Sequence, residues 1–355
     1  MRVLAFTLGA VLISIAVVDT IGTLVATRIQ TRKWWPTALL YRYTWPIWRG
    51  FAKKIDDEDD REAFLSIYGP LSLLTLLIFW VTMQVLGWGL VWWGYRTGIH
   101  TISSLLESVY YAGIAFFTVG FGDVVPVASA PRILVLVEAF FGVTTMALLI
   151  GFMPSAFSAY SAREELVTTL DDLSGDRVTP LGMLEAYARD GNASSLYEMF
   201  ERWELWTGSV LESHSTYPML MLFRSKQSGQ SWIAASVIMT ETAALCVSII
   251  DGPPDPRALR LCRRTAQMAA RLENAIALEG LIRGRASIDI PEERLRVIYD
   301  RLGELGFERR PYDDVRRRID AWHEAYLPAL SSLVARLLIA PEFRLPPAVA
   351  ALSYD

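Results

Sequence analysis

Three apolar runs in the first half of the chain constrain its fold more than any other feature. They cover residues 3–25, 64–93 and 133–153. A hydrocarbon core about 30 Å thick is crossed by roughly 20 helical residues, and each run has that length. Inside lipid every backbone polar group needs an internal partner, which a helix supplies. We therefore expect three transmembrane helices.

The overall composition agrees with a chain that lies partly in a membrane. Of 355 residues, 52% are hydrophobic and 20% are charged, and the mean hydropathy is +0.29, a balance that soluble domains rarely show. The formal net charge is only -4, which argues against nucleic acid as a partner. The two cysteines, Cys246 and Cys262, are too few for a disulfide framework and lack zinc-ligand neighbours. We expect both to be reduced, buried thiols.

Charge in the loop after the first run predicts the orientation. Its basic residues occur with no acidic residue among them: Arg28, Arg32, Lys33, Arg42, Arg49, Lys53 and Lys54. The positive-inside rule places this loop in the cytoplasm. The N-terminus is then outside and the C-terminal region is cytoplasmic, in a multi-pass protein of the plasma (inner) membrane. A cleaved signal peptide is the alternative for the first run, but its basic part holds only Arg2, and cleavage would leave the basic loop outside.

A fourth run, residues 232–250, is less suited to lipid. It is rich in Ala, Ser and Thr and contains Glu241, and an acidic residue at the centre of a span costs about 2.5 to 3.5 kcal/mol. A crossing would also export the arginines that follow this run. We therefore expect a buried core helix of a soluble domain, with a fourth span as the alternative.

The stretch between the second and third runs, residues 100–131, is too apolar for an ordinary loop and too short to cross the membrane twice. It predicts a segment that enters the membrane and returns. Ser104 and Glu107 have the spacing of a capping box, in which each side chain bonds the backbone amide of the other residue. This box predicts a short helix over residues 104–117. Directly after it comes Thr118-Val119-Gly120-Phe121-Gly122-Asp123.

This segment has the chemistry to hold dehydrated cations if four copies meet around an axis. Gly120 and Gly122 can adopt backbone conformations closed to other residues, so that successive carbonyls point inward. Four chains would then stack rings of carbonyl oxygens, with the Thr118 hydroxyls innermost, in place of the water shell of a potassium ion. Val119 and Phe121 would point away from the ion and pack against the short helix.

Residues 118–123 resemble the signature of potassium channel selectivity filters, in the form with Phe in place of Tyr. The resemblance covers about residues 64–155 and implies an all-α membrane protein, a tetrameric pore-loop channel with a helical cytoplasmic domain. It implies an outer helix 64–95, a pore helix 104–117, a filter 118–123 and an inner helix 131–157. It also implies potassium bound at Thr118, Val119, Gly120 and Phe121, with Gly122 completing the filter, Asp123 at the outer mouth, and gating hinges at Gly142 and Gly151.

The segment departs from the commonest filter pattern in two ways. Phe117 stands where many channels have a second Thr, and Tyr110 and Tyr111 stand where some have a Trp pair. These tyrosines can form an aromatic cuff around the filter. Ile114 occupies the place where some bacterial channels carry Glu, so filter gating through a carboxyl pair is not carried over.

Several residues near the spans leave two interpretations open. Gly142 and Gly151 are either hinges or small residues that allow close helix packing. Glu138 either pairs behind the filter or lies at the outer interface. Asp19 either pairs with a basic residue of a neighbouring helix or reaches to the interface. The acidic run 56–60 suits a solvated helix start better than a divalent cation site or a docking surface.

The patterns divide the chain into four parts: a transmembrane helix over 1–27, a basic and aromatic interfacial segment over 28–63, the pore domain over 64–157, and a cytoplasmic domain over 158–355. Helix start and stop residues in the last part predict an α-helical domain, without the Gly-rich turn of a dinucleotide-binding fold. His214 and His323 make a metal site only if the fold joins them, and the arginine clusters at 263–264 and 316–318 are typical of solvated faces. The ligand of this domain is therefore unknown from the sequence.

These patterns together predict a homotetrameric, potassium-selective channel that opens by inner-helix movement and is modulated by its cytoplasmic domain. The expected partners are three identical subunits, the lipid bilayer and an unknown cytoplasmic ligand. We expect no enzyme activity, no catalytic residues, no nucleic acid and no cofactor beyond potassium ions in the filter. Two alternatives stay open: a weakly selective cation channel, since selectivity depends on how rigidly the filter is held, and a membrane-anchored helical receptor or enzyme with a non-conducting pore loop.

Overall fold

The computed structural model describes residues 1–24, 34–96, 99, 102–174, 179–189, 193–225, 231–278 and 292–339. Within these ranges every named element is a helix, and the extended contacts are two isolated bridges, Ile99 with Pro126 and Ile250 with Arg309. The all-α fold class expected from the sequence is confirmed. Residues 28–33 of the expected basic loop lie outside the described residues.

The chain forms two compact units, each built from two stretches of sequence. The first unit comprises residues 1–41 and 70–157, and the second comprises 42–69 and 158–355. The sequence assigns residues 64–69 to the pore domain and residues 28–63 to a separate interfacial segment, whereas residues 42–69 cluster with the C-terminal helices.

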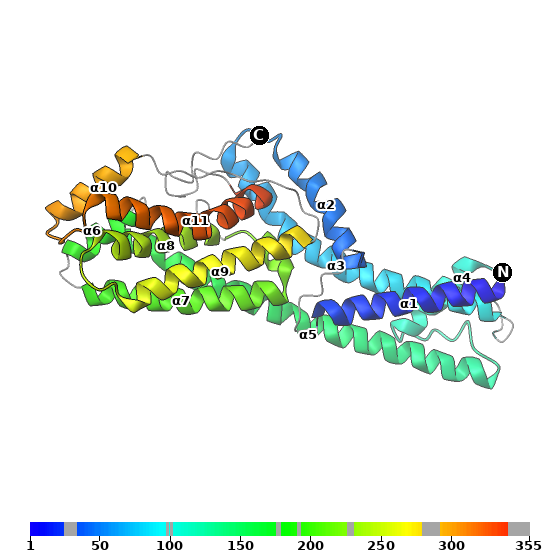
Figure 1. Ribbon diagram of the computed structural model, residues 1–355. Helices are drawn as coiled ribbons and strands as arrows, with labels where there is room; N and C mark the ends of the chain where they lie inside the picture. The colour runs from blue at the N-terminus through cyan, green and yellow to red at the C-terminus, as the bar shows by residue number, and fades with distance from the viewer. Residues whose placement is uncertain are drawn as a thin grey trace. The chain divides into compact units, whose positions relative to one another are not determined.

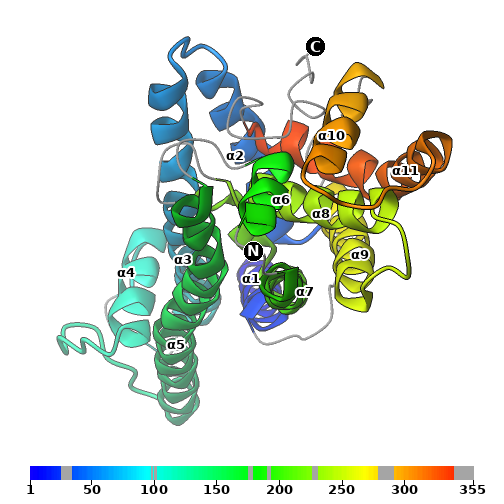
Figure 2. The ribbon, with the colours of Figure 1, turned by 90° about the vertical axis from the view of Figure 1, so that its left-hand side faces the viewer.

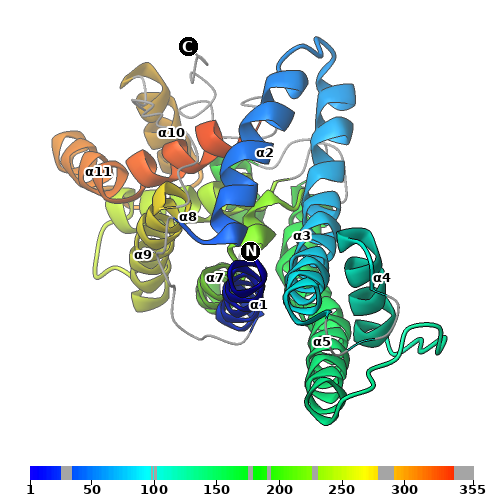
Figure 3. The same cartoon turned by 90° about the vertical axis from the view of Figure 1, so that its right-hand side faces the viewer.

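The first unit holds the apolar helices. It contains α1 (Arg2–Leu24), the start of α2 (Pro36–Ala52), the later part of α3 (Glu58–Tyr95), α4 (Leu105–Phe116) and the earlier part of α5 (Ser129–Ser174). Helices α1, α3 and α5 are long and apolar enough to span a membrane. The short helix α4 lies beside α3 and α5, and the loop that follows it extends outward from the helices (Figures 2 and 3).

Helices α3 and α5 are longer than expected and take part in both units. Helix α3 begins before residue 64 and α5 continues past residue 157. Each contains a proline close to the division between the units, Pro70 in α3 and Pro154 in α5. A proline inside a helix lacks the amide that would bond the carbonyl four residues earlier. The two helices are therefore continuous through the division, but each has one missing hydrogen bond near it.

The acidic run before α3 serves as its start. The Asp57 carboxylate accepts a hydrogen bond from the Asp60 amide at 2.9 Å, and Glu58 pairs with Arg61 at 3.3 Å. Acidic groups in a first turn are favoured by the helix dipole. The favoured interpretation of this run, a solvated helix start, is confirmed.

Glycines bring α1 against α3 of the same chain. A Cβ atom at Gly9 would lie 2.4 Å from the carbonyl oxygen of Gly87, and one at Gly94 would lie 2.8 Å from that of Arg2. Small residues permit this approach between helices in lipid, where no hydrophobic effect drives association. Figure 3 shows α1 beside α3. The first span therefore packs on its own chain.

Asp19 of α1 is buried, with 1% of its surface exposed. Its Oδ2 atom accepts hydrogen bonds from Trp80 Nε1 at 2.7 Å and from the Thr37 hydroxyl and amide at 2.6 and 3.1 Å. The expectation that this side chain reaches to the interface is wrong, and its partners among the described residues are uncharged. A buried carboxyl is retained only where hydrogen bonds replace its lost hydration, and Trp80 of α3 supplies one of them.

The second unit is a helical bundle. Besides parts of α2, α3 and α5 it contains α6 (Pro180–Arg189), α7 (Ala193–Thr216), the 3-10 helix η2 (Pro218–Leu222), α8 (Trp232–Ile249), α9 (Pro256–Leu278), α10 (Glu292–Glu304) and α11 (Tyr312–Leu337). Helices α7, α8, α9 and α11 run side by side, with α9 packed against the other three (Figure 1).

Helix α8 forms the centre of this bundle. It is apolar enough to pass as a span, yet all of its residues are buried inside the unit, as expected for a core helix. Glu241 accepts a hydrogen bond from Tyr326 at 2.6 Å and lies 3.0 Å from His323 Nε2. Both cysteines are free and buried, and burial raises the pKa of the Cys246 thiol to about 12. The expected buried thiols are confirmed.

The contact between α1 and α3 predicts a sharp difference between two glycines. Gly9→Ala should destabilise the protein by about 1–3 kcal/mol, because its methyl group overpacks the interface. Gly50 of α2 is the matched control, since a Cβ atom there meets nothing within 4 Å. Gly50→Ala should raise the free energy of unfolding by about 0.5–1 kcal/mol, because alanine favours a helix more than glycine does. Thermal unfolding of the purified protein measures both, and a Gly9→Ala protein with an undiminished Tm would contradict the packing.

Candidate functional site

Helix α4 begins with the capping box that the sequence predicts. The Ser104 hydroxyl accepts a hydrogen bond from the Glu107 amide at 3.1 Å, and the Glu107 carboxylate accepts one from the Ser104 amide at 3.2 Å. The same carboxylate accepts bonds from the Ser103 amide and hydroxyl at 2.6 and 2.9 Å. These bonds satisfy amides that the first turn leaves without helical partners, so they determine where α4 starts.

Close backbone contacts hold α4 between α3 and α5. A Cβ atom at Gly89 of α3 would lie 3.0 Å from the Cα atom of Val109. A Cβ atom at Gly142 of α5 would lie 2.0 Å from the carbonyl oxygen of Phe116, the last residue of α4. Neither position accepts a larger residue unless α4 moves, so the two glycines set the position of this helix.

Three amides after α4 point back to its C-terminal end. The Thr118 amide donates to the Ala115 carbonyl at 3.0 Å, and the amides of Val119 and Gly120 donate to the Ile114 carbonyl at 2.8 and 3.4 Å. In a trans peptide the N–H of one residue and the C=O of the preceding residue point in opposite directions. The carbonyls of these three peptide units therefore point away from α4.

Along the same segment, residues with left-handed backbone alternate with residues of negative φ. The φ angles of Thr118, Gly120 and Gly122 are 55, 61 and 80 degrees, whereas Val119 and Phe121 lie outside the positive range. Glycine adopts positive φ without strain, but an L-residue with a Cβ atom pays about 1–2 kcal/mol there. An extended strand would turn successive carbonyls to opposite sides. Alternation of this kind turns them toward one side, as the coordination of a cation requires.

The apolar side chains of the predicted filter are largely exposed within one chain. Val119 and Phe121 have 51% and 70% of their surface exposed. Their expected packing against α4 is therefore at most partial in a single chain. One face of α5 is apolar and exposed as well, at Ile133, Leu136, Phe140, Val143 and Ile150.

The two tyrosines of α4 point to different places. The Tyr110 hydroxyl donates a hydrogen bond to Asp123 Oδ2 at 2.8 Å, which steadies the carboxylate after the filter. Tyr111 is buried, and its ring meets that of Trp92 edge-on at 5.1 Å. The expected aromatic cuff is thus divided between the end of the filter and the core behind α4.

Glu138 of α5 lies fully buried, with 0% of its surface exposed. Its Oε2 atom accepts a hydrogen bond from Trp92 Nε1 of α3 at 2.6 Å. Of the two interpretations left open by the sequence, the buried carboxyl with a Trp92 partner fits the pairing, and the position behind the filter stays a prediction.

The two candidate hinge glycines differ in their surroundings. Gly142 packs against the end of α4, so its small size has a steric reason. A Cβ atom at Gly151 meets nothing within 4 Å among the described residues, so packing against them does not account for this glycine. A hinge role for either residue stays a prediction.

The C-terminal part of α5 carries a buried arginine that sequence reasoning missed. Arg163 has 2% of its surface exposed. It donates hydrogen bonds to the carbonyls of Leu220 and Phe223 at 3.0 and 2.9 Å, and to Glu164 at 2.8 Å. Leu220 belongs to η2, and Phe223 follows it directly. A guanidinium with its donors fixed in one plane suits several acceptors at once, so Arg163 holds the η2 segment against α5.

Arg163 also determines the tautomer of His214 and adds to the effect of burial in lowering its pKa. Its Nη1 atom lies 3.1 Å from His214 Nε2, and because arginine only donates, this ring nitrogen accepts and Nδ1 carries the hydrogen. Burial, and then the nearby Arg163 charge, hold the pKa of His214 well below its ordinary value. His323 lies with Glu241 instead, and no metal-binding group of three or more His, Cys, Asp or Glu side chains occurs among the described residues. His214 and His323 thus contact Arg163 and Glu241 respectively, and the fold does not bring the two histidines together.

The η2 segment also contacts the beginning of α3. Arg224 pairs with Glu62 at 3.4 Å, and a Cβ atom at Gly69 would lie 2.9 Å from the Phe223 ring. The Tyr160 hydroxyl of α5 donates to the Arg224 carbonyl at 3.0 Å. Residues 218–225 therefore join, within the second unit, the two helices that continue into the first.

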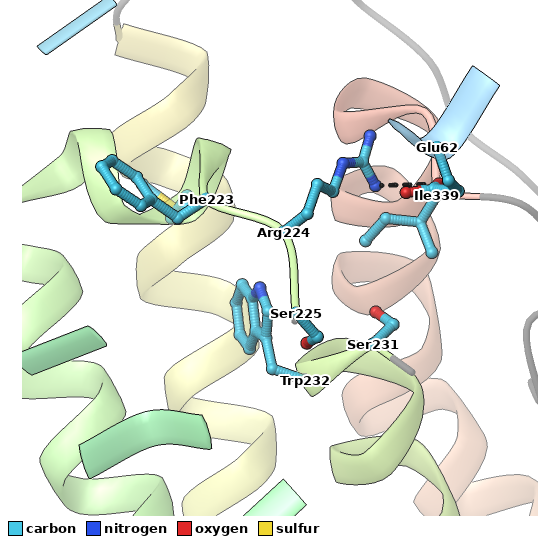
Figure 4. Close-up of a pocket in the computed structure, with 8 residues that line it drawn as sticks. Glu62, Phe223, Arg224, Ser225, Ser231, Trp232 and Ile339 are labelled. Carbon is cyan, nitrogen blue, oxygen red and sulfur yellow. Dashed lines mark ion pairs between the residues drawn. The ribbon is translucent and has the colours of Figure 1, made fainter. Parts of the chain in front are cut away.

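A small pocket beside this segment is the candidate ligand site of the second unit. Figure 4 shows the Arg224 side chain directed toward Glu62 and Ile339. Its guanidinium also donates to the carbonyls of Leu337 and Leu338. The pocket is lined by Glu62, Met221, Phe223, Arg224, Ser225, Ser231, Trp232 and Ile339. Because the arginine is engaged by protein groups, the pocket identifies no ligand.

The arginine clusters on the bundle surface are engaged in ion pairs. Arg264 lies 3.9 Å from Glu204, and Arg316 lies 3.0 Å from Asp320. Arg317 pairs with Asp314. These arginines lie on solvated faces of their helices, as the sequence indicates.

Comparison with known proteins supports a pore-loop channel. Residues 71–159, which include α4 and residues 118–123, match the family model described as ion channel. An uncharacterized membrane protein of Bacillus subtilis (strain 168), YdjJ, is 24% identical over 207 residues, which are 56% of this chain and 58% of the relative. The chain thus spans less than two thirds of that relative. No solved structure matches. The comparisons and the apolar helices together support a multi-pass membrane protein with an ion channel pore.

The contact at Gly142 predicts that it and Gly151 respond differently to the same substitution. Gly142→Ala should destabilise the protein by about 3 kcal/mol or more, because its methyl group overlaps the Phe116 carbonyl. Gly151→Ala should leave the thermal unfolding temperature within about a degree or two of the wild type, because its methyl group meets no described residue within 4 Å and changes the free energy of unfolding little. Unfolding followed by fluorescence in detergent tests the pair, and equal Tm values for both variants would refute the contact.

Proposed function

We propose that this protein is a homotetrameric, potassium-selective channel in which each chain supplies one quarter of the filter. The backbone of residues 118–122 carries the proposal: left-handed residues alternate along it, and its first amides bond to the end of α4. Stacked carbonyl rings of this kind replace the water shell of a potassium ion. Potassium is then held at Thr118, Val119, Gly120 and Phe121, with Asp123 at the outer mouth.

Four copies are needed because one chain offers oxygen atoms on one side of an ion only. Closed rotational symmetry is the common way to bring identical surfaces around an axis. The exposed apolar side chains of the filter support such an assembly, because Phe121 is 70% exposed beside a path for ions. We expect neighbouring subunits to bury these filter side chains, and lipid to cover the outward faces of the helices.

The orientation follows from the positive-inside rule. The filter end of α4 and Asp123 then face the outside, and the second unit lies in the cytoplasm. Helix α4 directs its C-terminal dipole toward the inner side of the filter, which favours a cation there.

Gating is proposed to couple the second unit to α5. Helix α5 is continuous over Ser129–Ser174, and Arg163 ties its later part to the η2 segment. A shift of the bundle against that segment moves the later part of the same helix whose earlier part contacts α4 at Gly142. This is a two-state coupling through packed elements, and its stimulus is the unknown cytoplasmic ligand.

One observation favours a second candidate, a weakly selective cation channel. Val119 is half exposed within one chain, so the rigidity of the filter depends on contacts between subunits. A loosely held ring accepts sodium as well as potassium. The permeability ratio for the two ions separates the candidates.

The first test is flux through the purified protein in liposomes. Wild-type protein should carry potassium in preference to sodium and be blocked by barium, whereas Gly120→Asp should abolish flux because it places a charged side chain at a left-handed filter position. Gly306→Asp is the matched control, since Gly306 also has positive φ, of 88 degrees, but lies after α10. Its flux should equal that of the wild type. Assembled wild-type tetramers without flux, or flux that survives Gly120→Asp, would contradict a conducting filter.

The second test concerns coupling. Arg163→Lys keeps the charge but loses the planar fork that bonds the two carbonyls. It should change the potassium flux by about 2- to 30-fold, the effect of 0.5–2 kcal/mol on a coupled equilibrium, and leave the ratio of potassium to sodium permeability unchanged. Arg317→Lys, at a side chain that is 78% exposed, should change neither. Unaltered flux in Arg163→Lys would refute the coupling.

A further inference from the structure

A carboxyl group of α5 lies where three helices of the first unit meet. Glu138 is fully buried, and Trp92 of α3 donates a hydrogen bond to it at 2.6 Å. The Trp92 ring in turn meets the ring of Tyr111 of α4 at 5.1 Å, with an angle of 70 degrees between the planes. Edge-to-face aromatic pairs of this geometry are attractive beyond their buried area. Trp92 therefore stands between the carboxyl group of α5 and the middle of α4.

The same core holds three polar atoms that have no hydrogen-bond partner among the described residues. They are Glu138 Oε1, the Tyr111 hydroxyl and Trp88 Nε1. Trp88, Trp92 and Tyr111 belong to one buried cluster with Ile114 and Phe116, and Trp92 contacts both Glu138 and Tyr111. Native proteins seldom leave such atoms unpaired, and ordered water commonly bridges them.

We propose that Glu138 is a positioning residue for the filter, which links α5 to α4 through Trp92 of α3 and, by way of a bound water, through Tyr111. The inference rests on the proposed potassium channel function. Glu138 touches no ion, and it acts through α4. The Ile114 carbonyl, which accepts the amides of Val119 and Gly120, lies less than one helical turn after Tyr111. A shift of α4 is therefore passed directly to the filter backbone.

The expected consequence is a loss of discrimination between ions before a loss of assembly. Selectivity depends on how firmly the carbonyl rings are held at one diameter. The link through Glu138 opposes movement of α4 away from α3 and α5, whereas the glycine contacts oppose only its approach. Without Glu138, α4 keeps its place but gains freedom to move outward.

Four variants test this with the permeability ratio of potassium to sodium in liposomes. Glu138→Gln keeps one acceptor and one donor and should stay within about twofold of the wild type, because the amide reproduces both bonds. Glu138→Leu should lower the ratio by about tenfold or more, since it removes the whole buried network. Trp92→Phe keeps the ring contact, removes the N–H, and should lower the ratio by about threefold.

The fourth variant separates positioning from mere structural support. In Trp92→Phe with Glu138→Leu no buried polar group of this pair is left unpaired, so thermal stability should return toward that of the wild type. The permeability ratio should stay low, because the link is still absent. Recovery of the ratio together with stability would overturn the proposal, as would a Glu138→Leu ratio equal to the wild type. If Glu138→Leu fails to assemble, an unchanged ratio in Trp92→Phe overturns it equally.

The wild-type arm distinguishes this inference from the function on which it rests. A wild-type protein that does not prefer potassium contradicts the proposed function itself. A potassium-selective wild type with four equally selective variants contradicts only the role of Glu138.

Discussion

The Ile114 carbonyl is the group on which the arrangement of the candidate pore depends. It accepts the amides of Val119 and Gly120 and so joins an irregular segment to a regular helix. Backbone at membrane depth that is neither helix nor barrel is tolerated only where it is buried in protein or lines an aqueous path. These bonds satisfy two amides of the predicted filter on one side, and the carbonyls of the same peptide units point to the other side.

The helices around α4 are placed by the absence of side chains as much as by their presence. Gly89 and Gly142 admit the backbone of α4 from two sides, and Gly9 and Gly87 admit α1 against α3. In water, apolar side chains would drive such contacts, but lipid is as apolar as leucine, so shape and hydrogen bonds decide. The hydrogen bonds from Trp80 to Asp19 and from Trp92 to Glu138 fix the relative orientation of neighbouring helices, which non-directional apolar packing does not do.

The features that sequence reasoning predicted correctly are local. The capping box at Ser104, the acidic start of α3 and the buried character of α8 each follow from residues within one helix. What it missed depends on partners far along the chain. Trp80 lies 61 residues from Asp19, and Trp92 lies 46 residues from Glu138, so neither pairing has a periodicity or spacing to reveal it. Arg163 is harder still, because an arginine after an apolar helix ordinarily indicates the solvated end of a span.

The proline of α5 has a mechanical consequence. Pro154 removes the bond to the Ile150 carbonyl, and Gly151 beside it has open space on its outer side. A helix bends most easily at a turn that lacks a hydrogen bond. Earlier in the same helix, Gly142 is in close contact with Phe116. The helical hydrogen bonding of α5 is thus weakest near Pro154, several turns after the contact between Gly142 and Phe116.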